Sequence, residues 1–382
     1  MFGFIAKHYT ESNWSDATLL LYFIIVTVAC ICSRMSQRGK VVVFTTTYHV
    51  YRPKNRVNYI VIAISFLILV FFSAFRDVGV DVPMYKSIFL DSTSRYADTY
   101  GIEPGFLILN KVLRIFGVSA DFAIAFFSVA TLWFIFKSIL HYADQLNIGI
   151  SVLAVCCLYY FPSFNMMRMY FAASIMLYGF RWLLEDNLRK YLCYFFIASL
   201  IHYSAVIFLP VAMGILMFQY SEKIFFLLFS LGGILSFKVV SYLSSISIIA
   251  RYDHYLADGV ADGGLGIMHW VINIPLFALY LYASKKLNKS VYLSALLVLT
   301  LFELLIGLLS YQIVIFGRSL VYFNVLFVII IPILLKRLSK MRVSYHKMIS
   351  SCYVLYLLFR FYIYLSEYLY LDGIMPYKLN FV

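Results

Sequence analysis

Residues 57–75 read VNYIVIAISFLILVFFSAF and contain no charged side chain. A helix needs about 20 mostly apolar residues to cross the hydrocarbon core of a bilayer. Comparable apolar runs recur, for example at Leu19–Ile31 and Val291–Leu301. Backbone groups in lipid must be hydrogen-bonded within the structure, and these runs lack the two-residue alternation of a barrel strand. The sequence therefore predicts an all-α, polytopic membrane protein.

The composition of the whole chain agrees with this prediction. Its 382 residues are 63% hydrophobic and 13% charged, whereas a soluble domain has roughly a quarter charged residues. The net charge of +13 favours basic cytoplasmic loops over nucleic-acid binding, because no basic-aromatic nucleic-acid motif is present. The six cysteines have no metal-ligand spacing and indicate small core residues. We expect a single transmembrane domain, residues 1–382, that binds no nucleic acid.

Apolar character predicts about 11 membrane segments, including a possible re-entrant pair. They are residues 17–33, 57–75, 119–140, 148–162, 166–183, 191–217, 223–243, 267–284, 291–312, 319–335 and 346–366.

The loops between these segments differ in charge. Segment 34–56 has six Lys and Arg residues and no acid, and the loops 285–289 and 336–347 are also basic. The positive-inside rule places these three loops in the cytoplasm. The acidic loops then lie outside: we expect 76–118 to be an outer (periplasmic) loop with an amphipathic helix, and 244–266 to be a second outer loop.

Strict alternation through all segments conflicts with this assignment, because it would place 250–266 inside. The conflict disappears if 191–217 enters the bilayer and returns as two halves around His202. Alternatively, the amphipathic stretch 104–117 crosses the bilayer, which would put Arg189 and Lys190 outside.

Ionisable residues at membrane depth are costly and mark candidate functional positions. Under this topology four arginines lie at the outer mouth of the membrane domain: Arg76, Arg168, Arg251 and Arg318. A guanidinium binds phosphate oxygens in a bidentate manner and stays charged when partly desolvated, so a cluster of arginines suits a lipid-linked pyrophosphate. Each could instead contact lipid headgroups or pair with a neighbouring acid, as Arg76 could with Asp77.

Two further ionisable residues, His202 and Glu303, lie within apolar segments. His202 lies in an apolar segment, where it either bonds to a neighbouring helix or acts near neutral pH. Glu303 is more typical of a structural partner for an arginine. Asp77 and Asp81 are four residues apart and lack the Asp-x-Asp spacing of a metal-dependent nucleotide-sugar site. We therefore expect no cofactor and no metal.

Several short motifs, in order, resemble the EpsG-like, Wzy-type family of O-antigen and exopolysaccharide polymerases. They are FRDVGVD at 75–81 followed by Tyr85, EPGF at 103–106, NMMRMYFA at 165–172, IHYSA at 201–205, and Gly317-Arg318 before Tyr322-Phe323. Met169 departs from the pattern, which has Gln after the arginine, so any role for that side chain is in doubt.

The resemblance implies a GT-C-like membrane glycosyltransferase in the bacterial cytoplasmic (inner) membrane, with its active site toward the periplasm. The implied donor and acceptor are oligosaccharide repeat units linked to undecaprenyl pyrophosphate, and undecaprenyl pyrophosphate leaves. Membrane lipids, a chain-length regulator and a flippase are further expected partners. The expected catalytic residues are Asp77, Asp81 and His202. The expected substrate-binding residues are Arg76, Arg168, Arg251, Arg318, Asn165, Tyr85, Glu103 and Tyr252.

Two other functions remain open from the residues alone. An O-antigen ligase would share the arginines, but its large outer loop usually comes late, whereas the longest here is early, at 76–103. A flippase or transporter of the lipid-linked oligosaccharide would be expected to show internal repeats, and the sequence has none.

Overall fold

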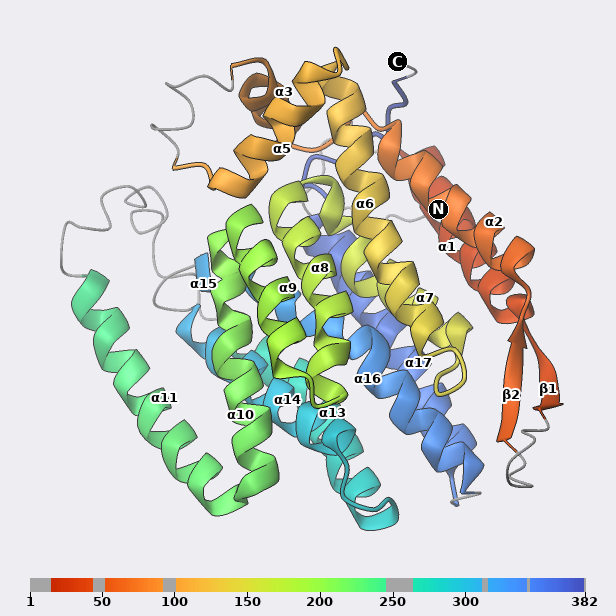
Figure 1. Cartoon of the computed structure of the whole chain (residues 1–382), viewed down its shortest axis with the longest axis vertical. Coiled ribbons are helices and arrows are strands. Elements are labelled where there is room, and N and C mark those ends of the chain that lie inside the picture. The colour runs from red at the N-terminus through yellow and green to blue at the C-terminus, as the bar shows by residue number, and fades with distance from the viewer. Residues whose placement is uncertain are drawn as a thin grey trace. The chain divides into compact units, whose positions relative to one another are not determined.

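The computed structural model describes residues 15–43, 52–91, 101–244, 264–310, 315–341 and 344–380, and most of these are helical (Figure 1). Within these ranges six helical spans are long and apolar enough to cross a membrane: Asp16–Ser36, Ala120–His141, Tyr203–Tyr220, Val291–Leu309, Phe316–Lys340 and His346–Tyr368. Two shorter apolar helical spans are Tyr59–Ala74 and Ile148–Tyr160. The predicted polytopic helical membrane protein is thus confirmed at this level, while the full number of crossings stays a prediction.

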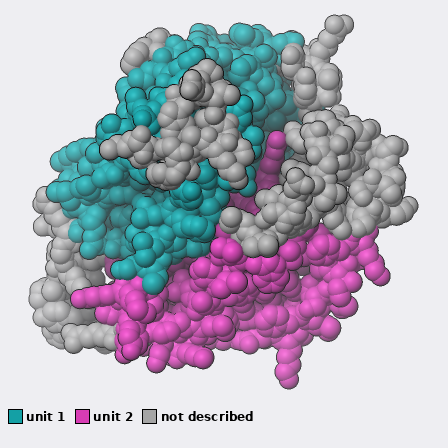
Figure 2. Space-filling view, turned by 180° about the vertical axis from the view of Figure 1, so that it is seen from behind, with its two compact units in different colours: residues 1–205, 350–382 teal, residues 206–349 magenta. Residues whose placement is uncertain are grey.

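The chain forms two compact units, shown in different colours in Figure 2. Unit 1 combines residues 1–205 with residues 350–382, and unit 2 is residues 206–349. The C-terminal segment therefore joins the N-terminal half of the chain, which the order of the sequence does not reveal.

Unit 1 contains most of the motifs. Its helices are α1 (Asp16–Ser36), α2 (Tyr59–Ala74), α3 (Val82–Leu90), α5 (Pro104–Ile115), α6 (Ala120–His141), α7 (Ile148–Val155), α8 (Met167–Leu184) and α9 (Leu188–Ile201). A π-helical turn, Cys156–Tyr160, extends α7, and the short 3-10 turns are Pro162–Phe164 and Tyr203–Ile207. Helix α17 (His346–Ile363), which begins in unit 2, continues into a second π-helical turn, Tyr364–Tyr368.

Short polar side chains fix where several of these helices begin. Ser15, Asn58, Ser119 and Asn147 precede α1, α2, α6 and α7, and each side chain accepts a hydrogen bond from a backbone N–H of the first turn. The first N–H groups of a helix have no partner within it, and such caps satisfy them where the chain enters an apolar segment.

Helices α1 and α2 pack on each other, α6 packs on both α2 and α8, and α8 forms a hairpin with α9. At one end of unit 1 the amide of Gln37 donates to the carbonyls of Ala143 and Leu146. His141 contacts Glu185 at the same end, 2.7 Å apart. We call this the basic end, because it adjoins segment 34–56. The other end holds residues 75–81, 103 and 202, and we call it the motif end.

Unit 2 contains α10 (Phe208–Tyr220), α11 (Glu222–Ser244), α13 (Gly264–Lys286), α14 (Val291–Leu309), α15 (Ile315–Arg318) and α16 (Val321–Lys340). Helix α14 contacts α10, α13 and α16. Gly307 on α14 allows a close approach to α13, because a Cβ there would lie 2.6 Å from Nδ1 of His269. Helix α16 is almost wholly buried, so it forms the core of this unit.

Three local features differ from or refine the sequence predictions. The basic segment 34–56 contains an antiparallel hairpin of β1 (Gln37–Val43) and β2 (Arg52–Val57), so the fold is not purely α. The outer loop 76–118 contains α3 as well as the expected amphipathic helix, α5. The long segment 191–217 is interrupted at His202, as predicted, where the backbone turns extended with φ −154° and ψ 118°.

Candidate functional site

Arg76 begins the candidate site by fixing the loop that follows α2. Its guanidinium donates to the carbonyl of Phe164 from Nε (3.2 Å) and from one terminal nitrogen (3.0 Å). The other terminal nitrogen donates to the Ser73 carbonyl and to Ser128 Oγ. Burial lowers the pKa of Arg76 to about 10, so it still carries its charge at neutral pH. The residue is 4% exposed, and its charge faces protein oxygens at the motif end.

The rest of the FRDVGVD loop is held by the C-terminal tail. Gly79 N–H donates to the Gly373 carbonyl and Val80 N–H to the Asp372 carbonyl, at 3.0 and 3.1 Å. Gly79 has φ +118°, and a Cβ there would lie 2.8 Å from the Phe164 carbonyl oxygen. Only glycine fits both conditions without strain. The family-like glycine is therefore explained by backbone geometry.

Asn165 connects this loop to the tail through its side chain. Its Oδ1 accepts from the Asp81 N–H at 2.8 Å, and its amide donates to Asp372 Oδ1 at 3.1 Å. Tyr364 donates to the other oxygen of Asp372 at 2.7 Å. Asn165, expected to bind substrate, thus lies in a buried network that orders the start of α3.

The ionisable centre of the motif end is a three-residue network around Glu103. Oε2 of Glu103 lies 2.5 Å from a terminal nitrogen of Arg168, and Oε1 lies 2.5 Å from Nδ1 of His202. The Tyr203 N–H also donates to Oε1, at 3.3 Å. The side chains of Glu103, Arg168 and His202 are 5%, 15% and 24% exposed. Solvent exposure therefore increases from the Glu103 carboxylate to the His202 imidazole.

Three helix ends bring these residues together. Glu103 precedes α5, Arg168 lies in the first turn of α8, and His202 follows the last residue of α9. The α8–α9 hairpin returns the chain to the end where α8 began. Gly105 allows α5 to approach α9, because a Cβ there would lie 2.7 Å from the Leu200 carbonyl oxygen.

The electrostatics of the network favour an ionised Glu103. Burial opposes its charge, but the hydrogen bond with His202 and the positive charge of Arg168 outweigh burial, so the pKa of Glu103 is lowered. Because an ionised carboxylate only accepts hydrogen bonds, His202 donates from Nδ1.

Two aromatic rings border Arg168. Its guanidinium carbon lies 5.9 Å from the ring centre of Tyr85 and 5.6 Å from that of Phe106. Burial raises the pKa of Tyr85 to about 12, against the opposing charge of Arg168. Tyr85 therefore keeps its proton at neutral pH. The two rings lower the local dielectric around the Arg168 guanidinium. A lower dielectric strengthens the attraction between this positive charge and an anion.

Two nitrogen groups of the network remain available for other contacts. Nε2 of His202 makes no hydrogen bond with the described residues, and Nε of Arg168 is buried without an acceptor. An imidazole oriented through Nδ1 can accept a proton at Nε2, and a guanidinium beside it can bind an anion. Within the described residues no three His, Cys, Asp or Glu side chains are placed to hold a metal ion.

The other predicted site residues are placed as follows. Asp77 and Asp121 both contact Lys86, at 3.3 and 2.7 Å. Asp81 begins α3 without capping it through its side chain. Arg318 is exposed and belongs to unit 2, while Arg251 and Tyr252 lie outside the described residues. Convergence of all four arginines on one cavity therefore stays a prediction.

Sequence reasoning missed two features of the motif end. The sequence does not show that Glu103 joins Arg168 to His202, and its expected contact with substrate stays a prediction. Asp372 was not singled out at all, because nothing in its local sequence indicates contact with a loop almost 300 positions earlier. The position of Glu103 before Pro104, where the backbone is forced to be extended, was the one available signal.

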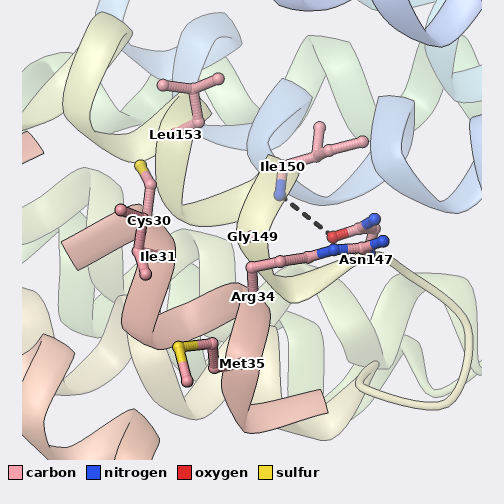
Figure 3. A pocket seen from close by; sticks show the side chains of 8 residues that line it. All are labelled: Cys30, Ile31, Arg34, Met35, Asn147, Gly149, Ile150 and Leu153. Carbon is pink, nitrogen blue, oxygen red and sulfur yellow. Dashed lines mark hydrogen bonds between the residues drawn. The ribbon is translucent and has the colours of Figure 1, made fainter. Parts of the chain in front are cut away.

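A pocket of about 450 Å³ lies elsewhere, between α1 and the start of α7 (Figure 3). Its lining includes Cys30, Arg34, Ile150 and Leu153, and Asn147 Oδ1 accepts from the Ile150 N–H at its rim. It is at the basic end, so it does not contain the Glu103 network.

Comparison with known proteins supports the resemblance seen in the motifs. No curated protein and no solved structure matches the chain. The model of the EpsG family matches residues 59–379, a range that includes the whole Glu103 network and the C-terminal tail. Because the match extends over most of the chain, this protein belongs to the EpsG family.

Proposed function

We propose that this protein is a membrane glycosyltransferase that polymerises oligosaccharide repeat units carried on undecaprenyl pyrophosphate. Membership of the EpsG family indicates a polysaccharide polymerase-type function. The observation that carries the chemical part is the Glu103 network, because it places an oriented imidazole beside a partly desolvated guanidinium.

In this proposal Arg168 binds the pyrophosphate of the donor. Glu103 holds one terminal nitrogen, while Nε, which has no acceptor among the described residues, would bind a phosphate oxygen. A preorganised donor in a water-poor site stabilises charge that develops on a leaving group, and removing one such donor costs roughly 10²–10³ in rate. Tyr85 and Phe106 exclude water from the side of the guanidinium.

His202 acts as the general base. Glu103 accepts from Nδ1 and leaves the lone pair of Nε2 for the acceptor hydroxyl, much as a buried carboxylate orients a catalytic histidine elsewhere. The hydroxyl oxygen bonds to the anomeric carbon of the donor while its proton moves to Nε2. The bond from that carbon to the pyrophosphate oxygen breaks, and undecaprenyl pyrophosphate leaves with the electron pair.

The remaining expected residues have less direct roles in this proposal. Asp77 and Asp81, which are expected to be catalytic, stay alternative candidates for the general base. Arg251, Tyr252 and Arg318 stay candidates for contacts with the donor. Arg76 and Asn165 act as positioning residues, because their polar groups hold the FRDVGVD loop.

The proposed setting is the bacterial cytoplasmic membrane, with the motif end toward the periplasm and a GT-C-like arrangement of helices. The charge distribution supports it, since segment 34–56 adjoins the opposite end of unit 1. Undecaprenyl-pyrophosphate oligosaccharide serves as donor and acceptor, and a flippase and a chain-length regulator are proposed partners.

The test is complementation of a strain that lacks the gene, scored by the ladder of glycan chain lengths. His202→Ala and Glu103→Gln should abolish long chains and leave single repeat units on the final acceptor. His141→Ala is the matched control, because His141 also pairs with a glutamate at 2.7 Å but at the basic end. Long chains accumulating on the polyprenyl carrier would indicate a ligase instead, and repeats retained inside would indicate a flippase.

We further propose that the reaction does not depend on a metal ion. The donor has its own leaving group, so purified protein should form polymer in excess EDTA. Loss of activity with chelator and recovery with Mg²⁺ or Mn²⁺ would show that the acidic residues of 76–118 bind a metal.

A further inference from the structure

The basic end of unit 1 carries a group of cations and aromatic rings that the proposed reaction does not use. The cation–aromatic strip consists of Lys137 on α6, Tyr178, Arg181 and Trp182 on α8, and Lys190 on α9. Spacings of three and four residues on α8 bring its members to one side of that helix. The α8–α9 turn brings Lys190 beside them.

The contacts within the strip are cation–ring contacts. The Arg181 guanidinium carbon lies 3.9 Å from the ring centre of Tyr178 and 4.3 Å from that of Trp182. Nζ of Lys190 lies 4.0 Å from the Trp182 ring centre, and Nζ of Lys137 lies 4.9 Å from that of Tyr178. A guanidinium stacked on a ring keeps its N–H donors at its edge, where an oxygen ligand can reach them.

The strip has donors without acceptors. The charged groups of Lys137, Arg181 and Lys190 make no ion pair or hydrogen bond with the described residues. Nε of Arg181 and Nε1 of Trp182 are both buried without an acceptor. A buried donor without a partner is costly, so two on consecutive residues indicate that an acceptor normally binds there.

The acids near the strip do not supply that acceptor. Glu185, which follows α8, contacts His141 at 2.7 Å. Asp186 is exposed in the turn at φ +62° and makes no ion pair with the three cations. Three positive charges and two buried N–H groups therefore have no acidic partner among the described residues, and an anionic ligand would satisfy them.

The surface next to the strip is apolar and indicates what kind of anion binds. Val129 and Trp133 precede Lys137 at four-residue steps on α6, and Trp133 is 55% exposed. On α9, Ile197 follows Lys190 by two helical turns, lies on the same side of the helix and is 50% exposed. A ligand with a phosphate at the strip and hydrocarbon along these residues is an amphiphile.

We propose that the cation–aromatic strip binds the phosphate group of an anionic glycerophospholipid, whose acyl chains lie along the exposed apolar residues of α6 and α9. Cations and tryptophan at the end of a membrane helix match the depth of lipid headgroups. The site lies at the end of unit 1 opposite the Glu103 network, so it does not depend on the proposed reaction.

The test uses the purified full-length protein in detergent, titrated with phosphatidylglycerol and followed by native mass spectrometry. Phosphatidylcholine, which has the same acyl chains and no net charge, and inorganic phosphate at matched ionic strength are the comparison ligands. Wild-type protein should bind phosphatidylglycerol more tightly than phosphatidylcholine. Arg181→Ala and Lys190→Ala should each weaken phosphatidylglycerol binding by about fivefold or more, as expected for loss of one headgroup cation.

Arg189→Ala is the matched control, because Arg189 is exposed and adjacent to Lys190 but contacts no ring of the strip. It should bind phosphatidylglycerol as the wild type does. Should Arg181→Ala fail to accumulate, Lys137→Ala and Lys190→Ala, both at exposed positions, decide the question, because each should weaken phosphatidylglycerol binding. Equal affinities of wild type and both lysine variants would overturn the proposal. Displacement of phosphatidylglycerol by millimolar phosphate would also overturn it, because the site would then bind the free anion.

Discussion

At the scale of single residues, two arginines that are similar in the sequence differ in their contacts. Arg76 donates only to protein oxygens and is 4% exposed. Arg168, in contrast, keeps a donor group without an acceptor beside the partly exposed imidazole of His202. The same side chain thus stabilises the fold at one position and is available for a ligand at the other.

Arg76→Ala should therefore reduce stability, and Arg168→Lys should reduce activity. Loss of Arg76 leaves the buried carbonyls of Ser73 and Phe164 without their donor, at a cost of about 3 kcal/mol. Lysine at 168 keeps the charge but loses the planar fork. We expect low membrane abundance for the first variant, and normal abundance without long glycan chains for the second.

Lys111→Ala is the control for both arginine variants, because it removes one positive charge at an exposed position of α5. Normal abundance of Arg76→Ala would contradict its structural role. Normal glycan ladders from Arg168→Lys would contradict the phosphate-binding role.

The lowered pKa of Glu103 predicts how stability depends on pH. Because the folded-state pKa lies below the unfolded value of about 4.3, the ionised group stabilises the fold above that pH. This contribution is lost as pH falls through the folded-state pKa. The melting temperature of wild type in detergent should exceed that of Glu103→Gln between about pH 7 and 5, and the difference should shrink below about pH 4. A difference that grows toward low pH would refute the assignment.

At the scale of elements, the α8–α9 hairpin sets the distance between Arg168 and His202. The two helices meet closely at Gly179, where an added Cβ would lie 2.4 Å from Cβ of Tyr194. Tyr194 in turn packs edge-to-face on Tyr178. The interruption of the chain at His202 then ends α9 where the imidazole reaches Glu103.

Gly179→Ala should push α8 and α9 apart and displace the two ends of the network. We expect a loss of about 1–3 kcal/mol in stability, as for overpacking elsewhere, and a larger relative loss of activity, because a shift of about 1 Å can cost 10²-fold in rate. Melting temperature and glycan ladders measure the two effects. Gly232→Ala on α11 is the control, since among the described residues no atom beyond the adjacent backbone of α11 lies within 4 Å of its added Cβ.

At the scale of the whole molecule, the orientation in the membrane is the prediction with the widest consequences. An impermeant thiol reagent added outside should label Ile115→Cys near the motif end and not Leu188→Cys at the basic end. Both residues are exposed, at 82% and 48%. The background must lack Cys193 and Cys352, which are themselves exposed. The reverse pattern would place the Glu103 network on the cytoplasmic side and would exclude the proposed reaction on outer-leaflet substrate.

The sequence by itself determined the class of fold and many of its helices. Apolar runs, capping residues and the break at His202 are local signals, because a helix satisfies its backbone within one segment and the bilayer fixes its length. The family resemblance also came from local motifs, and the match over residues 59–379 confirms it. The hairpin in segment 34–56 was missed, because its basic residues indicated only a cytoplasmic loop.

Only the tertiary structure decided what the motif residues contact. Glu103 and His202 are 99 positions apart, and Asn165 and Asp372 are 207 apart. Such contacts depend on how helices pack, and no local pattern specifies them. For this reason the sequence grouped Arg76 with Arg168 as phosphate ligands, while packing buried the first among carbonyls. Packing also placed Glu103 between Arg168 and His202. There the backbone is extended, and the two neighbouring side chains keep the buried carboxylate ionised.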